Sequence, residues 1–140
     1  MTTIHSSEPI VDTSAEGIAL ALCRLGIVGA VFSQDARAER IELTHEETRY
    51  QIHVFASSDS AHRAALFSAR FGIPVQHWEA QAWADRHLFG RLYREDDGGA
   101  MIQFSVPLDG ITDRMLNAVI ETWLHTLSEF RVFCLERADR

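Results

Sequence analysis

The chain has 140 residues, a formal net charge of -7 at pH 7 and 13 basic residues, all of them arginine. Its length suits a single domain with one hydrophobic core, and its 46% of hydrophobic residues is ordinary for a globular protein. Because an acidic surface repels phosphate backbones, the charge argues against nucleic-acid binding.

Residues 1–12 are polar and irregular and are predicted to be a flexible lead-in. They hold no basic stretch followed by an apolar core, so we identify no signal peptide and expect a cytoplasmic protein. No apolar run reaches the roughly 18 residues that a membrane-spanning helix needs, which predicts that the protein has no membrane partner.

A first helix is expected directly after this lead-in. Thr13 or Ser14 can act as its N-cap, because short polar side chains accept hydrogen bonds from the free N–H groups of a first turn. Gly26 is expected to end the helix, since glycine adopts the left-handed conformation that helix ends often need. Apolar residues recur at helical spacing within it: Ile18, Leu22 and Leu25.

Three strands are predicted next, over residues 28–34, 39–44 and 49–56. Apolar and polar residues alternate in the second and third of these segments, which is typical of strands with one buried and one wet face.

Residues 63–71 fit both a helix and a strand. Phe67 and Phe71 have the i, i+4 spacing of a helix face, but together with Ala69 they also alternate as in a strand. A strand is the better prediction, because Gly72-Ile73-Pro74 closes the segment too early for a stable helix.

A second helix is predicted from about residue 75 to residue 84, with Pro74 at or just before its first turn. Its apolar side includes Trp78, and Trp83 lies on this side or at its edge.

A β-hairpin is predicted over residues 86–108. Its strands are residues 86–94 and 100–108, and the acidic segment 95–99 forms the turn, where Asp97-Gly98-Gly99 tolerates positive φ. The second strand has apolar residues at every other position, which predicts one buried face: Ile102, Phe104, Val106 and Leu108.

A long amphipathic helix is predicted to follow the hairpin and to run to about residue 137. Thr112 is its expected N-cap, and Asp113 is favourable in its first turn. Ile111 and Leu116 have the spacing of a hydrophobic staple. The helix carries an apolar stripe that must lie on a sheet or on another helix: Leu116, Val119, Ile120, Trp123, Leu124, Leu127 and Phe130.

The predicted order of elements is therefore α-β-β-β-β-α-β-β-α. Antiparallel strands with helices at both ends and one helix between them predict an α+β domain, in which helices cover an antiparallel β-sheet. We expect this single domain to span residues 13–140.

Several segments of the second half of the chain carry a family resemblance. They are Trp83, the run Phe89-Gly90-Arg91-Leu92-Tyr93, the turn Asp96-Asp97-Gly98, residues 102–108, Gly110-Ile111-Thr112, and the apolar residues of the long helix from Leu116 through Leu135. With the order of elements, these segments resemble the YbjN family. The better-matching part is residues 82–135.

The resemblance implies the fold of the class I type III secretion chaperones. It also implies a small acidic homodimer that binds a polypeptide or regulates through protein contacts, and it supplies no catalytic residues.

The residue spacings do not match motifs for metal binding or catalysis. His77 and His87 are ten residues apart and lack the i, i+4 spacing of a helical metal pair. Cys134 and His125 lie on one helix with Cα atoms roughly 13 Å apart, too far for a catalytic dyad. The acidic turn lacks the alternating ligands of a calcium loop. We therefore expect no enzyme activity, no metal and no cofactor.

Aromatic residues mark a candidate protein-binding surface instead. Strand alternation predicts Phe89, Tyr93 and Phe55 on the sheet face that the long helix leaves open, where polar residues are usual. Either another element covers them, or they form a patch for a polypeptide partner. Trp78 and Trp83 share one short helix, so both are core residues or one of them lies at a homodimer interface.

The sequence thus favours a non-catalytic protein-binding module, a chaperone-like adaptor or regulator. The alternative is a sensor or regulator that binds a small molecule between the sheet and a helix.

Overall fold

The computed structural model describes residues 8–34, 39–56 and 62–138, so residues 1–7 of the predicted lead-in lie outside the described part. Three helices and six strands follow in the predicted order: α1 (Ala15–Arg24), β1 (Val31–Gln34), β2 (Glu39–His45), β3 (Thr48–Ala56), β4 (Arg63–Pro74), α2 (His77–Arg86), β5 (Arg91–Arg94), β6 (Gly99–Pro107) and α3 (Asp113–Ala138). The ambiguous segment 63–71 is a strand, as predicted.

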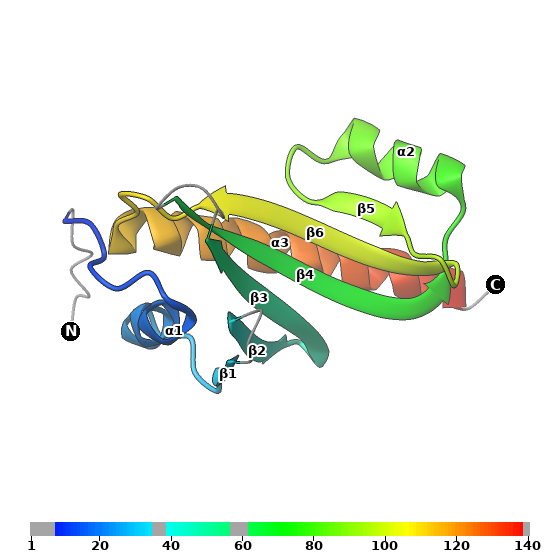
Figure 1. Cartoon of the computed structure of the whole chain (residues 1–140). Coiled ribbons are helices and arrows are strands. Elements are labelled where there is room, and N and C mark those ends of the chain that lie inside the picture. Colours follow the sequence, from blue (N-terminus) through cyan, green and yellow to red (C-terminus); the bar gives the residue numbers. More distant parts are fainter. Residues whose placement is uncertain (1–7, 35–38, 57–61, 139–140) are drawn as a thin grey trace.

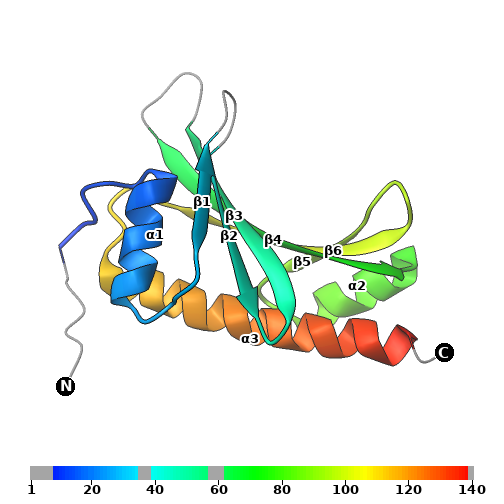
Figure 2. The same ribbon diagram turned by 90° about the horizontal axis from the view of Figure 1, so that it is seen from below.

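The strands form one antiparallel sheet in the order β1-β2-β3-β4-β6-β5, and the helices lie along one of its faces. Helix α3 runs along the molecule behind β4 and β6 in Figure 1 and packs against both strands. Helix α1 lies near its N-terminal half against β1, β2 and β3, and α2 lies near its C-terminal half (Figure 2). This is the predicted α+β architecture. No described helix is long and apolar enough to cross a membrane.

The core lies between this face and α3, and Trp123 is at its centre. The strand register aligns Ile41, Ile52, Phe67 and Phe104 across four neighbouring strands. The fully buried indole of Trp123 contacts the rings of Tyr50, Phe67 and Phe104, with centroids 5.5–6.3 Å away. The predicted stripe of α3 is therefore the side that packs on the sheet.

Both predicted helix caps are confirmed by local hydrogen bonds. Ser14, rather than Thr13, caps α1, and its hydroxyl accepts from the backbone N–H of Gly17 at 3.2 Å. The hydroxyl of Thr112 accepts from the backbone N–H of Met115 at 3.1 Å at the start of α3. Each cap satisfies a backbone donor that the helix itself leaves free.

The predicted boundaries around α2 are wrong. Pro74 is the last residue of β4, and α2 begins at His77. The N-cap residue is Gln76, whose backbone N–H donates to Glu79 Oε1 at 3.0 Å. At the other end the helix continues to Arg86, where the sequence predicted the start of a strand.

Strand β5 is consequently shorter than predicted and begins at Arg91. Residues 87–90 form a loop that turns at Gly90, whose φ is +80°. A side chain at Gly90 would meet the methyl group of Thr126 at 2.8 Å and Ile102 at 3.2 Å, so glycine is required both for the turn and for the close approach to α3. Strand β1 is also shorter than expected and starts at Val31.

Replacing Ile120 by alanine should lower the free energy of unfolding by about 2–5 kcal/mol, because its side chain is 2% exposed and the helix and sheet around it can collapse only partly. Urea denaturation measures this loss. Val132→Ala on the same helix is a control, since Val132 is 55% exposed. Equal small losses in both variants would contradict the packing of α3 described here.

Candidate functional site

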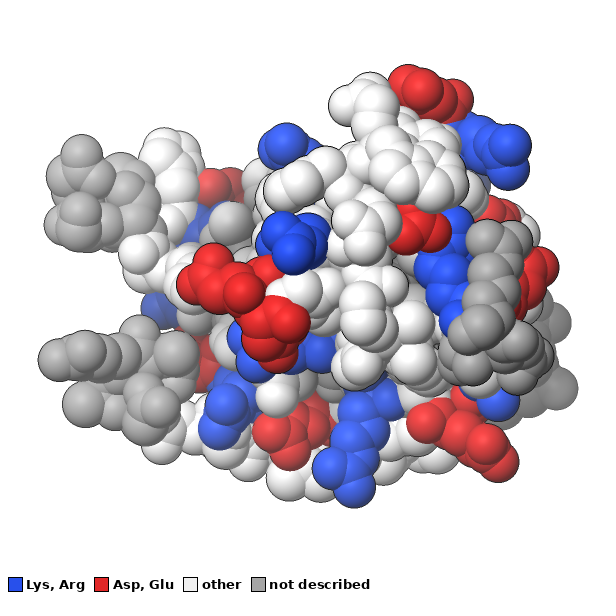
Figure 3. Space-filling model, turned by 90° about the vertical axis from the view of Figure 1, so that its right-hand side faces the viewer, with Lys and Arg blue, Asp and Glu red and all other residues white. Residues whose placement is uncertain are grey.

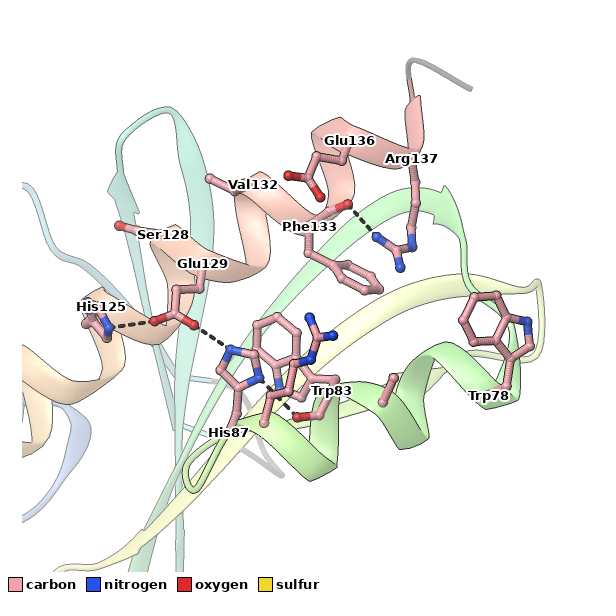
Figure 4. A pocket seen from close by; sticks show the side chains of 12 residues that line it. Trp78, Trp83, His87, His125, Ser128, Glu129, Val132, Phe133, Glu136 and Arg137 are labelled. Atoms are coloured by element: carbon pink, nitrogen blue, oxygen red, sulfur yellow. Dashed lines mark hydrogen bonds and ion pairs between the residues drawn. The ribbon is translucent and has the colours of Figure 1, made fainter.

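A groove runs between α2 and the C-terminal half of α3 and has a volume of about 720 Å³ (Figure 4). We call it the α2–α3 groove. Twelve residues line it: Trp78, Ala82, Trp83, Arg86, His87, His125, Ser128, Glu129, Val132, Phe133, Glu136 and Arg137.

Ion pairs fix the two helices at both ends of the groove. At one end Arg137 donates to the carboxylate of Glu79, and at the other His87 pairs with Glu129. Because Glu79 is near the start of α2 and Arg137 near the end of α3, the helices run antiparallel. Glu79 is 7% exposed, and its carboxylate also accepts from the N–H of Gln76, so this buried charge is paired and hydrogen-bonded.

The floor of the groove is the indole of Trp83, which is 4% exposed. Its N–H donates to the carbonyl oxygen of Gly90 at 3.1 Å, and its edge contacts involve Phe130 and Phe133 of α3. The imidazole of His87 stacks on it with a centroid distance of 3.7 Å. Trp83 therefore joins α2 to both the loop before β5 and α3.

A carboxylate lies between two imidazoles in the wall of the groove. Glu129 Oε2 pairs with His87 Nε2, and Glu129 Oε1 lies 2.6 Å from His125 Nε2. The other ring nitrogen of His87, Nδ1, is 3.0 Å from the carbonyl oxygen of Trp83. Both nitrogens of His87 thus face oxygen atoms that can accept a hydrogen bond.

The rim of the groove is apolar and exposed. Trp78 is 67% exposed on α2, and Val132 is exposed on the opposite wall. Arg86 and Glu136, also exposed, have no hydrogen-bond or ion-pair partner among the described residues, whereas the guanidinium of Arg137 lies 3.4 Å from the centroid of the Phe133 ring. Figure 3 shows the side of the molecule that lies at the right in Figure 1. Uncharged surface occupies much of its upper part, with charges of both signs around it.

The predicted binding residues do not form one surface. Phe55 on β3 and Tyr93 on β5 lie on the open face, as predicted, but β4 and β6 separate their strands. Phe89 is in the loop before β5, and its ring lies 5.9 Å from Phe104 on the helix-covered side. The prediction for Phe89 is wrong because strand alternation does not apply to a loop residue.

The two tryptophans of α2 have different surroundings. Trp83 is a core residue and Trp78 is exposed, so the prediction that one of them is free for an interface remains open for Trp78 alone. Sequence reasoning missed the contribution of α3, although His125, Glu129 and Phe133 recur at four-residue spacing and so share one side of that helix.

The two cysteines have different surroundings. Cys134 is buried, and burial raises its pKa to about 12, so its thiol stays protonated at neutral pH. Cys23 is exposed on α1. In residues 8–34, 39–56 and 62–138, no three His, Cys, Asp or Glu side chains are grouped so that they could hold a metal ion.

The fold and groove define a small α+β domain with an exposed aromatic rim. Residues 14–136 match the model of the YbjN family, which is described as "Putative bacterial sensory transduction regulator". The chain therefore belongs to the YbjN family, as its second half suggested. No curated protein matches it.

A solved structure shares the fold. The crystal structure of an uncharacterized protein from Methanothermobacter thermautotrophicus is similar, with a TM-score of 0.60 and 14% sequence identity. The similarity covers 87% of this chain and 96% of that one, so most of the fold is shared.

The open face also holds a histidine with a shifted pKa. His53 on β3 has a pKa below the ordinary value of 6.5, because it is partly buried and because Arg40 and Arg70 repel its charged form. The unfolded chain keeps the ordinary value. Below pH 6.5 the unfolded state therefore binds a proton that the folded state resists, and the free energy of unfolding should fall as the pH drops.

Urea unfolding one pH unit above and one below that value measures the decline. In His53→Gln the part of the decline that belongs to His53 should disappear. An equal decline in wild type and variant would show that other groups cause it.

Proposed function

We propose that this protein is a non-catalytic regulator that acts through protein–protein contacts, and that the α2–α3 groove is one contact surface. The observation that carries this proposal is the position of Trp78. A tryptophan that is 67% exposed stands at the edge of a groove with an aromatic floor. Exposed tryptophans beside such hollows are typical of residues that dominate binding energy at interfaces.

The chemistry of the groove supports a binding role. Glu129 is shared between two imidazoles and Glu79 is paired with Arg137, so both carboxylates serve to hold the helices together. The buried thiol of Cys134 is protonated at neutral pH. The family description, a regulator of sensory transduction, agrees with a role in binding.

The occupant that fits this groove is a second copy of the chain. Arg86 lies at the end of the groove where His87 pairs with Glu129. Glu136 lies at the other end, where Arg137 pairs with Glu79. The two unpartnered charges are thus at opposite ends and of opposite sign. A two-fold axis through the middle of the groove would place Arg86 of each copy near Glu136 of the other.

The same axis would carry Trp78 to the Arg86 end of the second copy. Trp78 is near the start of α2 and Arg86 is its last residue, so the exchange of ends brings an indole toward a guanidinium. Such a cation–π contact is favourable, and it occurs twice in a symmetric dimer.

Trp78→Ala should convert the proposed dimer to a monomer at micromolar concentration, because truncation of a tryptophan that anchors an interface commonly costs at least about 2 kcal/mol of association. The variant should keep the far-UV circular dichroism spectrum of wild type, since the side chain is mostly exposed and the monomer fold does not depend on it. Analytical ultracentrifugation measures the association. Leu88→Ala is the matched control, because Leu88 is 96% exposed but lies outside the groove. A wild-type protein that sediments as a 15.8 kDa monomer would contradict the dimer.

Charge reversal tests the symmetry of the contact. Arg86→Glu and Glu136→Arg should each weaken the dimer by about tenfold, because each change replaces two attractive contacts by two repulsive ones. The double variant should recover most of the affinity, since the exchanged charges again face opposite signs. Losses that simply add in the double variant would exclude this arrangement.

A small-molecule sensor is the second candidate, favoured by the size of the groove. Its volume of about 720 Å³ is within the range of about 300–1,000 Å³ that is typical of ligand pockets. A thermal-shift screen with metabolites distinguishes the two functions. A compound that raises the melting temperature of wild type, and fails to do so in Ala82→Phe, would favour the sensor.

A further inference from the structure

The face of the sheet opposite α3 is open. In the register of the strands, Arg40, His53, Leu66 and Ser105 lie side by side across it, and so do Arg70, Met101 and Tyr93. These positions alternate with the buried ones that face α3, so their side chains point away from the helices. The helices of the described chain cover the other face.

A shallow hollow lies in the middle of this open face. It has a volume of about 430 Å³, and three arginines, Arg40, Arg49 and Arg70, line it together with His53 and Gln51. Leu66 and Met101 add apolar surface to the hollow. Positive charge therefore surrounds a partly apolar floor.

The charge of this face is opposite to that of the whole protein. Four arginines lie on it, and among the described residues they outnumber the acids that pair with them. Arg70 is 2.9 Å from Glu95, and Arg40 is 3.8 Å from Glu42. Within the described chain, Arg49 and Arg91 have no acidic partner, and Arg91 lies over the ring of Tyr93 at 5.1 Å. A chain with a net charge of -7 thus concentrates unpaired positive charge on one face.

The lowered pKa of His53 agrees with this distribution. Partial burial lowers this pKa most, and repulsion by the nearby guanidinium groups of Arg40 and Arg70 lowers it further. His53 is therefore neutral at neutral pH, and the arginines supply the positive charge of the hollow.

We propose that the open sheet face binds an extended acidic segment of a protein partner. Carboxylates of such a segment would pair with Arg49 and Arg91, which have no acidic partner of their own, and guanidinium groups bind carboxylates with two parallel hydrogen bonds. Apolar side chains of the segment would lie on Leu66 and Met101. A polypeptide is favoured over a nucleic acid, because the remaining surface of this acidic protein repels a long phosphate backbone.

This inference rests on the proposed function, since it names the chemistry of a partner for the same regulator. It uses different residues from those of the α2–α3 groove. A regulator whose copies associate through the groove would keep two open faces for such segments.

Fluorescence anisotropy with a fluorescein-labelled poly-glutamate peptide tests the proposal. Wild type should bind the peptide, and the affinity should fall with added salt. The double variant Arg49→Gln, Arg91→Gln should bind at least about tenfold more weakly, which corresponds to ~1.4 kcal/mol. Both side chains are exposed, so the variant should keep the wild-type melting temperature. Arg114→Gln is the matched control, because Arg114 is exposed on α3 and lies on neither surface.

Three results would overturn the proposal: no binding of the peptide at low salt, an equal loss in Arg114→Gln, or tighter binding of a single-stranded oligonucleotide of the same charge. The Trp78→Ala variant separates this inference from the proposed dimer. If it becomes monomeric and still binds the peptide, both hold, and if wild type is a monomer that binds the peptide, the dimer alone fails.

Discussion

The rest of the structure depends on the burial of the apolar stripe of α3 against the sheet. Trp123 lies at the centre of this contact and touches rings from β3, β4 and β6. A large aromatic side chain buries about 150–250 Å² of surface. Few other residue types could therefore contact three strands from one position on a helix. The contact also decides which face of the sheet stays open, since all side chains of the other parity must point away from α3.

The α2–α3 groove follows from the length of α3. With 26 residues, α3 continues well past Trp123, and its last turns line the groove beside α2. Helix α2 covers them through Trp83, which packs on Phe130 and Phe133. Because α2 is short and lies to one side, it leaves Val132 exposed, and the space between the helices remains as a groove.

The sequence predicted those features that depend on neighbouring residues. The caps at Ser14 and Thr112 and the stripe around Ile120 follow from spacing along the chain, and the structure confirms them. The loop that follows α2 was not predictable in this way. Its residue Gly90 lies close to Thr126 of α3, and its carbonyl oxygen accepts a hydrogen bond from the indole N–H of Trp83.

The groove could not be predicted from the spacing of residues along the sequence either. Its two ion pairs join residues 58 and 42 positions apart, and their meeting depends on how α2 crosses beside α3. Likewise, the positive charge of the open face appears only when the strand register places Arg40, Arg70 and Arg91 on one side. A net charge counted along the sequence conceals such a local excess of the opposite sign.

Helix α2 is held to the rest of the domain by few buried side chains, and this affects the hydrogen exchange of its backbone amides. This ten-residue helix has only two buried side chains, Glu79 and Trp83, and both are held by contacts with α3 or with the loop before β5. Its detachment would leave Trp123 and the central strands in place, so it costs less free energy than global unfolding. The backbone amides of α2 are therefore expected to exchange with solvent before those of α3.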